Sequence, residues 1–393
     1  MILYEHEGKN LFRSYGIKTP QSVLVSAREE LAHIVWDIFP CVLKVQVLKG
    51  KRGLHSGIFF AENTEDLSQK GEMLFAQPFQ GEQVCAILVE EKISILAEWY
   101  LSMTYSTRYF SPVLLFSFSG GNHVEEQRDI FETVIHPVRG FEEFRIRNFF
   151  LKCGVRGKDL LALVSLSRSL YTLFSEEDAR LAEINPLVRL SEGEFRALDA
   201  KVILDDDSEY RHTWHYPSRT VMGRAPTPRE QAVRVIDTGE FYYRGTAGKY
   251  IEFDGNIACL FSGGGASISM MDALEAVGGR AANYTEYSGN PPREKVYELA
   301  KIVFSKPNVK GIWIVGGVAN FTHIGETMAG IADALRDVAP SVPIVVRRAG
   351  PFEEEGRSRM EQTAREKNLN LSWYGREVSM TDTAKILMDK ISI

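Results

Sequence analysis

The sequence of 393 residues contains no apolar run long enough to span a membrane. Its first residues lack the charged and apolar regions of a signal peptide. Basic residues are not in excess, because 46 Lys and Arg stand against 52 Asp and Glu for a net charge of −6. These absences argue against a membrane protein, a secreted protein and a basic nucleic-acid interface. We therefore expect a cytoplasmic protein that binds neither membrane nor nucleic acid.

Cysteine is also scarce, and no C-x-x-C pair occurs. The four cysteines (Cys41, Cys85, Cys153 and Cys259) are far apart, which favours reduced thiols. A G-K-[ST] sequence that opens a helix, the mark of a Walker phosphate loop, is missing. The hydrophobic fraction of 44% and the length are ordinary for a globular protein with two or three domains.

The residues from 181 to 204 form a predicted β-hairpin with a turn at 191–193. Antiparallel pairing across this turn places Asn185 opposite Asp199, with Glu183 two residues along on the same face. An amide oxygen beside a carboxylate suits Mg²⁺ that carries nucleotide phosphates, since such an ion needs only one or two protein ligands. The alternative is a surface hairpin whose polar side chains are only solvated.

A second polar feature follows the strand predicted at 41–47, where Lys44 and Gln46 share one face. The next segment, 49–57, is a glycine-rich loop that contains Lys51, Arg52 and Gly53. Glycines allow backbone N–H groups to approach phosphate oxygens, and the basic side chains supply charge. The loop is therefore predicted to bind phosphate, and the alternative is a basic turn without a ligand.

The order and spacing of these features resemble the ATP-grasp half of the succinyl-CoA synthetase β-subunit family. Lys44-x-Gln46 and the basic loop are followed by Leu88-Val89-Glu90, by Glu98, and by Glu183-Ile184-Asn185-Pro186 with Asp199 fourteen residues beyond Asn185. The resemblance implies an ATP-grasp fold of two α+β lobes over residues 1–207, with ATP and Mg²⁺ as cofactors. By this resemblance the catalytic residues are Glu183, Lys44 and Arg52, and Glu183 orients a phosphohistidine of a partner chain. The implied nucleotide ligands are Lys44, Lys51, Arg52, Gly53, Glu90, Ile93 and Glu98, and the implied metal ligands are Asn185 and Asp199.

The periodicity changes in the second half of the chain. Residues 208–250 contain several prolines and are predicted to be a linker with a short helix. From residue 251 to 393, short buried-type strands alternate with helices. This alternation predicts a flavodoxin-like, doubly wound parallel sheet, so the fold class of the whole chain is α/β.

Ligands bind beyond the carboxyl ends of the strands in such sheets. Four segments are expected there: Ser262 to Gly265, Glu286 to Gly289, Gly316 to Thr322, and Arg347 to Gly350. Glycine loops that open helices, amide and hydroxyl side chains, and arginines suit a small polycarboxylate. The alternative is that these are only turn residues, with the arginines paired to Glu353–Glu355.

These four segments resemble the citrate-binding domain of the ATP-citrate lyase family. The shared motifs are G-G-G-A-S from Gly263, N-Y-x-E-Y-S-G from Asn283, G-G-x-A-N-F-T from Gly316 and V-R-R-x-G-P from Val346. Ser262 stands where succinyl-CoA synthetases carry Asn. The resemblance implies that citrate binds to Gly264, Ser288, Gly289, Asn320, Phe321, Thr322 and Arg348.

The G-H-A-G-A phosphohistidine loop of this enzyme family is missing, as is the length for a CoA-binding or a lyase domain. The resemblance therefore implies a hetero-oligomer whose partner subunit supplies the phosphohistidine, most of the CoA site and a lyase domain. Together the chains would form citryl-CoA from citrate, CoA and ATP, and the partner would cleave it to acetyl-CoA and oxaloacetate. Two alternatives are a succinyl-CoA synthetase β-type subunit that acts on succinate or another dicarboxylate, and a catalytically silent regulatory subunit.

Overall fold

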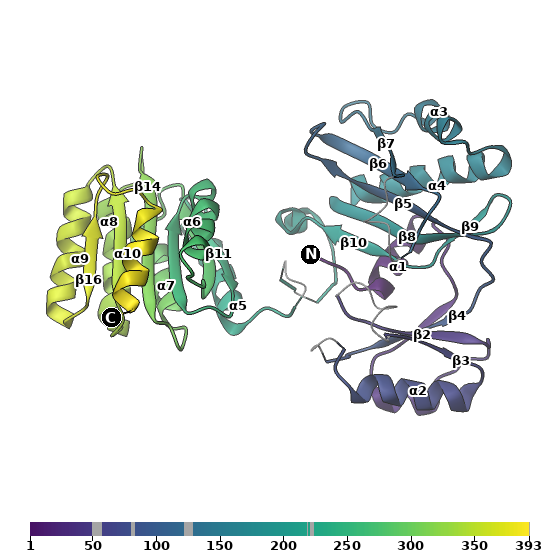
Figure 1. The fold of residues 1–393 in the computed structure, drawn as a ribbon, viewed down its shortest axis with the longest axis horizontal. Coiled ribbons are helices and arrows are strands. Elements are labelled where there is room, and N and C mark those ends of the chain that lie inside the picture. The colour runs from purple at the N-terminus through teal and green to yellow at the C-terminus, as the bar shows by residue number, and fades with distance from the viewer. Residues whose placement is uncertain (49–56, 80–82, 122–128, 218, 221–223, 393) are drawn as a thin grey trace. The chain divides into compact units, whose positions relative to one another are not determined.

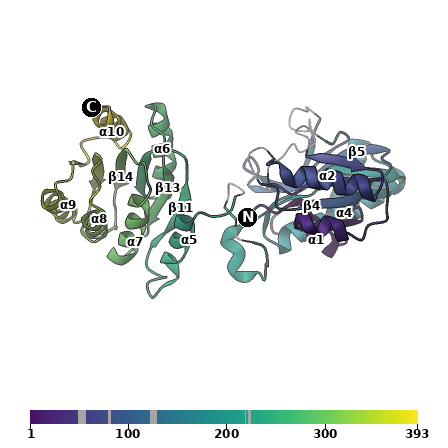
Figure 2. The ribbon, with the colours of Figure 1, turned by 90° about the horizontal axis from the view of Figure 1, so that it is seen from below.

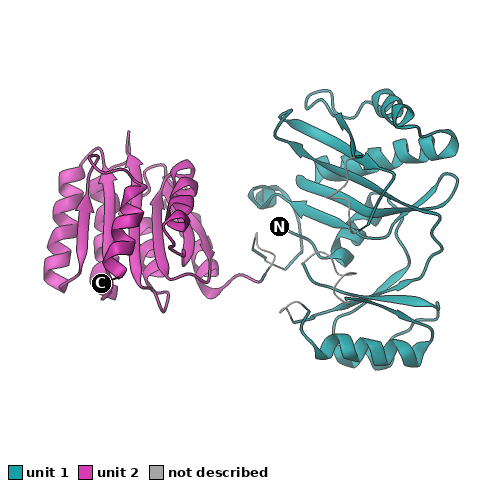
Figure 3. Cartoon of the chain, viewed as in Figure 1, with its two compact units in different colours: residues 1–224 teal, residues 225–393 magenta. Residues whose placement is uncertain are grey.

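The chain folds into two compact units, Met1–Arg224 and Ala225–Ile393 (Figure 3). The computed structural model describes residues 1–48, 57–79, 83–121, 129–217, 219–220 and 224–392. The boundary lies inside the segment 208–250 that the sequence predicts to be a linker. Of this segment, part of η4 (Asp206–Arg211) belongs to the first unit, whereas α5 (Pro228–Arg234), η5 (Ile236–Thr238) and most of β11 (Thr246–Glu252) belong to the second.

The first unit contains a small antiparallel sheet of order β1-β4-β2-β3. Its strands are β1 (Ser22–Val25), β2 (Cys41–Val45), β3 (Ile58–Ala61) and β4 (Ile87–Glu91). Helix α2 (Thr64–Ala76) and the turn η1 (Arg28–His33) cover one face, where Leu43 and Val45 pack with Leu67 (Figure 1). The predicted alternation in β2 is confirmed, because Lys44 points away from this core.

A larger antiparallel sheet has the order β10-β8-β5-β6-β7, and β9 also pairs with β8. Its strands are β5 (Ala97–Ser106), β6 (Ser111–Ser117), β7 (Phe131–Val134), β8 (Ala179–Ser191), β9 (Glu194–Ala197) and β10 (Lys201–Leu204). Helices α3 (Glu143–Cys153) and α4 (Gly157–Glu176) pack against it. The apolar stripe of α4 joins the core through Leu163, Leu170 and Phe174.

Helix α1 (Glu5–Ser14) lies between the two sheets (Figure 1). Leu11 and Phe12 join the core of the larger sheet. Gly8 faces β10, where an added Cβ would lie 3.1 Å from the Cβ of Ala200. The lack of a side chain at Gly8 therefore lets α1 approach the sheet closely, while its first turn reaches the small sheet.

The second unit is built on one six-stranded sheet of order β11-β13-β12-β14-β15-β16. The strands after β11 are β12 (Ile257–Ser262), β13 (Asn283–Ser288), β14 (Gly311–Val318), β15 (Ile344–Ala349) and β16 (Leu371–Tyr374). These five are parallel, and β11 joins as an antiparallel edge strand. The strand order is that of a flavodoxin-like fold, as the sequence predicts.

Helices lie on both faces of this sheet (Figure 2). They are α6 (Gly264–Ala276) and α10 (Asp382–Ile391) on one face, and α7 (Arg293–Phe304), α8 (Ile324–Val338) and α9 (Glu353–Lys367) on the other. Consecutive β12 residues serve different cores, since Leu260 packs toward α7 and α8, and Cys259 and Phe261 pack toward α6 and α10. Among the described residues, no helix combines the length and apolarity needed to cross a membrane.

Candidate nucleotide and carboxylate sites

The predicted hairpin register is present on both sides of the candidate metal ligands. Leu187 pairs with Ala197 in β9, and Glu183 pairs with Lys201 in β10. Between these pairs, the Leu198 N–H donates to the Pro186 carbonyl oxygen at 3.1 Å. Asn185 and Asp199 lie in this interval, where the ladder is interrupted, so the hairpin brings both toward Glu183.

Glu183 is surrounded by groups with opposite effects on its acidity. Burial raises its pKa above the ordinary value, and the nearby Asp199 carboxylate acts in the same direction. Lys201 and hydrogen bonds from Asn185 and Tyr100 oppose this shift. The Tyr100 hydroxyl donates to Glu183 Oε2 at 3.4 Å. The net effect is a raised pKa, so the removal of Lys201, Asn185 or Tyr100 would raise the pKa of Glu183 further.

Asn185 is oriented by the loop after β6. The Gly121 N–H donates to Asn185 Oδ1 at 2.7 Å, and Asn185 Nδ2 donates to the Gly121 carbonyl oxygen at 3.4 Å. An amide oxygen has a second lone pair, so Asn185 Oδ1 can still face a cation. Glu98 lies next to the same loop, because its carbonyl oxygen accepts a hydrogen bond from the Gly120 N–H at 2.9 Å. Glu98 is exposed.

The donor set fits Mg²⁺, because Asn185 and Asp199 offer the hard oxygens that this ion prefers. Among the described residues, no group of three or more His, Cys, Asp or Glu side chains forms a complete metal site. An ion that arrives on nucleotide phosphates needs only one or two protein ligands. The assignment of Asn185 and Asp199 as metal ligands stays a prediction.

Lys44 is held in a buried cluster next to this hairpin. Its Nζ lies 2.9 Å from Glu5 Oε1 and 2.7 Å from Glu90 Oε2, and it donates to the Leu198 carbonyl oxygen at 2.8 Å. Although burial lowers it, the carboxylates of Glu5, Glu90 and Asp199 together raise the pKa of Lys44. Lys44 thus connects the small sheet to the segment that carries Asp199.

The cluster shows where some predicted nucleotide ligands lie. Glu90, expected to line the adenosine, is only 1% exposed and forms ion pairs with Lys44 and Lys9. Ile93 follows β4 and is half-buried. The predicted phosphate ligands Lys51, Arg52 and Gly53 lie outside the described residues.

The sequence interpretation missed Glu5 and Lys9. Both lie on α1, and the Lys9 Nζ is 2.6 Å from Glu5 Oε1 and 2.6 Å from Glu90 Oε1. A signal was available, because opposite charges four residues apart share one helix face, and Phe12 continues that face toward the core. Charged residues on the buried side of a helix indicate partners elsewhere in the fold.

In the second unit, the predicted carboxylate loops meet at the point where the strand order reverses. Ser262 pairs with Gly316 at the carboxyl ends of β12 and β14, and Gly264 begins α6 immediately beyond. The loops after β13 and β14 are joined where the His323 N–H donates to Asn290 Oδ1 at 2.9 Å. This contact brings the segment with Ser288 and Gly289 to the segment with Asn320, Phe321 and Thr322. Asn320 and Phe321 are exposed, and Thr322 is half-buried.

Arg348 is the strongest candidate anion ligand in this region. Its side chain is 2% exposed, and Nη1 donates to the Gly317 carbonyl oxygen at 3.0 Å. The buried Nε and Nη2 have no hydrogen-bond partner within the described structure. Buried guanidinium N–H groups without acceptors are costly, so the arrangement fits an anionic ligand.

Arg347 has a different environment. Its Nε donates to the Val378 carbonyl oxygen at 3.0 Å and its Nη1 to the Gly316 carbonyl oxygen at 2.9 Å. Burial lowers the pKa of Arg347. No hydrogen bond or ion pair joins either arginine to Glu353–Glu355 in the described part of the chain, so the alternative in which those glutamates pair with the arginines is not what the structure has.

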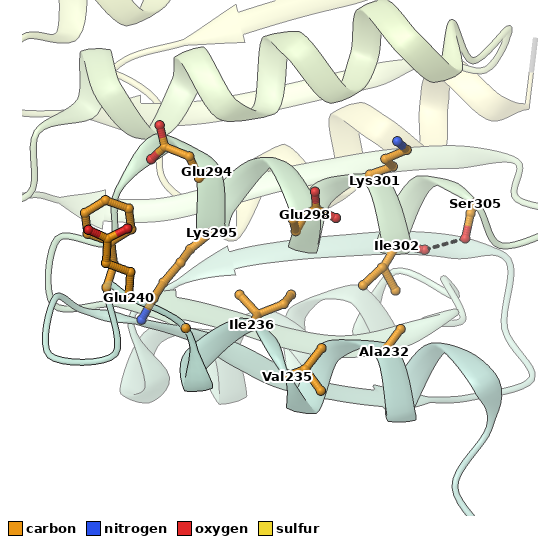
Figure 4. Close-up of a pocket in the computed structure, with 12 residues that line it drawn as sticks. Ala232, Val235, Ile236, Glu240, Glu294, Lys295, Glu298, Lys301, Ile302 and Ser305 are labelled. Carbon is orange, nitrogen blue, oxygen red and sulfur yellow. Dashed lines mark hydrogen bonds between the residues drawn. The ribbon is translucent and has the colours of Figure 1, made fainter.

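A separate cavity of about 610 Å³ lies between η5 and α7 (Figure 4). Val235 and Ile236 line one side, and Glu298, Lys301 and Ile302 of α7 line the other. None of the residues predicted to bind nucleotide or citrate lines this cavity. It is therefore a weaker candidate for the chemistry than the ends of β12, β14 and β15, where the glycine loops meet the buried Arg348.

Comparisons with known proteins identify both domains. Residues 2–189 match the family model described as ATP-grasp domain, and residues 224–390 match the one described as ATP citrate lyase citrate-binding. The succinate–CoA ligase [ADP-forming] β subunit of Desulfurococcus amylolyticus is 37% identical over 366 residues, covering 91% of this chain and 92% of that protein. The corresponding subunit of Methanocaldococcus jannaschii is 33% identical over 373 residues, covering 92% and 94%.

The fold is similar to the structure of ATP citrate lyase from Methanothrix soehngenii in complex with citrate and coenzyme A. The TM-score is 0.77 with 21% identity, and the match covers 99% of both chains. Fold, site and comparisons define an ATP-grasp ligase chain with a carboxylate-binding α/β domain. The chain belongs to the family of succinate–CoA ligase β subunits and carries a citrate-binding domain of the ATP citrate lyase type.

Proposed function

We propose that this chain is the ATP- and citrate-binding subunit of a complex that forms citryl-CoA from citrate, CoA and ATP. The observation that carries the proposal is Arg348, which is buried against Gly317 of β14 and whose Nε and Nη2 have no acceptor among the described residues. Citrate has three carboxylates, and a charge-assisted hydrogen bond to each N–H would contribute about 1.5–3 kcal/mol. The match to the citrate-binding domain over residues 224–390 supports the same substrate.

The first step transfers the γ-phosphoryl group of ATP to a histidine of the partner subunit and releases ADP. Mg²⁺ at Asn185 and Asp199 would neutralise charge on the phosphates. Lys44 and Arg52 would bind the nucleotide phosphates and stabilise the transferring group. Glu183 would accept the N–H of the partner's imidazole ring and so fix its orientation.

The second step uses the other unit. The phosphohistidine transfers its phosphoryl group to a citrate carboxylate held by Arg348, Asn320 and Thr322, which gives citryl phosphate and regenerates histidine. The CoA thiolate then attacks the acyl carbon and phosphate leaves, which forms the thioester. Cleavage to acetyl-CoA and oxaloacetate would belong to the partner, as would most of the CoA site. Each step is thereby a displacement with a good leaving group.

Succinate is the second candidate substrate, because the curated relatives are named as succinate–CoA ligase β subunits. Hydroxylamine traps acyl-CoA products, so the chain and its native partner should be assayed with Mg-ATP, CoA and either acid. We expect hydroxamate from citrate and none from succinate. Product from succinate alone would show that succinate, and not citrate, is the substrate. Product from neither acid would favour a silent regulatory subunit.

A further inference from the structure

Four charged side chains form a closed ring between the two sheets of the first unit. Lys9 and Lys44 each contact both Glu5 and Glu90, at N···O distances of 2.6 to 2.9 Å. All four side chains are at most 7% exposed, and that of Lys9 is fully buried. The ring contains two ammonium and two carboxylate groups, so it is electrically neutral when all four are charged.

Lys44 lies between both carboxylates of the ring. Its Nζ donates to Glu5 Oε1 and to the Leu198 carbonyl oxygen, and it forms an ion pair with Glu90 Oε2 at 2.7 Å, an oxygen that accepts no hydrogen bond within the described structure. A nucleotide phosphate that binds Lys44 therefore competes with these carboxylates for its ammonium group. Replacing a carboxylate would leave that buried anion without a counter-charge unless another cation is already in place.

We propose that Lys9 is a positioning residue for nucleotide binding, because it holds Glu5 and Glu90 neutralised while Lys44 exchanges a carboxylate for a phosphate. Lys9 itself touches no nucleotide in this scheme. The inference rests on the proposed nucleotide site and concerns a residue to which neither the resemblance nor the proposed mechanism gives a role.

The position of Lys9 supports this role. Its Nζ lies at the same distance, 2.6 Å, from one oxygen of each glutamate, so it remains paired to both when Lys44 moves. Burial lowers the pKa of Lys9 and the charge of Lys44 adds to this, while Glu5 and Glu90 oppose the shift. The same helix turn is fixed to β2 by the His6 N–H, which donates to Gln46 Oε1 at 3.0 Å. Helix α1 is thereby attached to the strand that carries Lys44.

A matched control lies on the same helix. Glu7 forms a buried bidentate pair with Arg219, with N···O distances of 2.6 and 2.8 Å. This pair contacts neither Lys44 nor Glu90 in the described structure. Glu7→Gln therefore breaks a buried ion pair of α1 and leaves the ring intact, which separates loss of stability from loss of nucleotide positioning.

The test is direct binding of Mg-ADP to the full-length chain by calorimetry, with the thermal unfolding midpoint measured in parallel. We expect Lys9→Met to raise the dissociation constant at least about tenfold, since Lys44 becomes the only counter-ion of two buried carboxylates. We expect Glu7→Gln to lower the unfolding midpoint and to leave the dissociation constant within about twofold of the wild type, because charges outside the ring do not enter the exchange.

A second variant covers the case in which Lys9→Met does not fold. Glu5→Gln with Lys9→Met removes one charge of each sign, so the ring stays neutral. Its affinity for Mg-ADP should be weaker than that of the wild type, because Glu90 loses its counter-charge when Lys44 binds phosphate. If Lys9→Met folds, the double variant should bind Mg-ADP more tightly than Lys9→Met, in which both Glu5 and Glu90 lose their counter-charge. The inference would be overturned if the soluble Lys9 variant bound Mg-ADP within about twofold of the wild type. It would also be overturned if Glu7→Gln lost as much affinity for Mg-ADP as the Lys9 variant.

This measurement needs no citrate, CoA or partner, so it separates two failures. A wild-type chain that binds Mg-ADP but gives no citrate product in the assay with its native partner would overturn the proposed substrate alone. A wild-type chain that binds no Mg-ADP would overturn both the nucleotide site and the role of Lys9.

Discussion

At the scale of single residues, Glu183 and Lys44 show how burial and neighbouring charges act in opposite directions. Burial raises the pKa of Glu183 and disfavours its carboxylate form. Around Lys44, the carboxylates of Glu5, Glu90 and Asp199 outweigh burial and stabilise the ammonium form. Burial thus makes the Glu183 carboxyl group harder to ionise, while the neighbouring carboxylates keep the Lys44 ammonium group charged.

Tyr100→Phe should move the acidic limb of the turnover profile to higher pH. The Tyr100 hydroxyl donates to Glu183 Oε2, and this hydrogen bond lowers the pKa of Glu183. Without it the pKa rises further, so at a given acidic pH a larger fraction of Glu183 is protonated and turnover falls. The rate at high pH, where Glu183 is ionised in both proteins, should change little. The pH–rate profile measures this, and a shift to lower pH would contradict it.

At the scale of elements, the ends of β12, β14 and β15 form the proposed carboxylate site. Ser262 and Gly316 are paired neighbours, and an added Cβ at Gly316 would lie 2.3 Å from Arg348 Nη1. The glycine at the end of β14 is therefore required by the close approach of the arginine from β15. This requirement is separate from any role of Gly316 in a turn.

Gly316→Ala should weaken citrate binding by about tenfold or more, because the methyl group displaces the guanidinium that makes the charge-assisted hydrogen bonds. Gly239→Ala is the control, since an added Cβ there meets nothing within 4 Å. Citrate affinity of the full-length variants can be measured by calorimetry. Equal affinity of Gly316→Ala and the wild type would show that Arg348 does not bind the carboxylate.

At the scale of the whole molecule, each unit has its own hydrophobic cores. The cores of the second unit include Val233 of α5 and Ala247 and Tyr250 of β11. These residues lie in the segment 208–250, so a fragment that begins at residue 251 lacks part of the core. It also lacks β11, the strand that pairs with β13.

The fragment 225–393 should therefore unfold cooperatively, and 251–393 should be markedly less stable or fail to fold. Citrate at about 100 times its dissociation constant should stabilise 225–393 by about 2.7 kcal/mol, whereas Mg-ADP should have no effect. Thermal unfolding with each ligand tests both statements. A shift with Mg-ADP, or equal stability of the two fragments, would contradict them.

Much of the fold follows from short-range patterns in the sequence. The period-two alternation predicted which face of β2 carries Lys44, and the turn at 191–193 set the register that flanks Asn185 and Asp199. Strands alternating with helices predicted the parallel sheet of the second unit. These features depend on backbone geometry and neighbours along the chain, so the sequence alone was sufficient to predict them.

Only the tertiary structure decided which charges meet. Lys9 and Glu90 are 81 residues apart, Gly121 and Asn185 are 64 apart, and Glu7 and Arg219 are 212 apart. Periodicity marks a side chain as inward or outward, but its partner depends on how distant elements pack. The unit boundary at Arg224 and Ala225 has the same origin, because β11 belongs to the second unit through its pairing with β13.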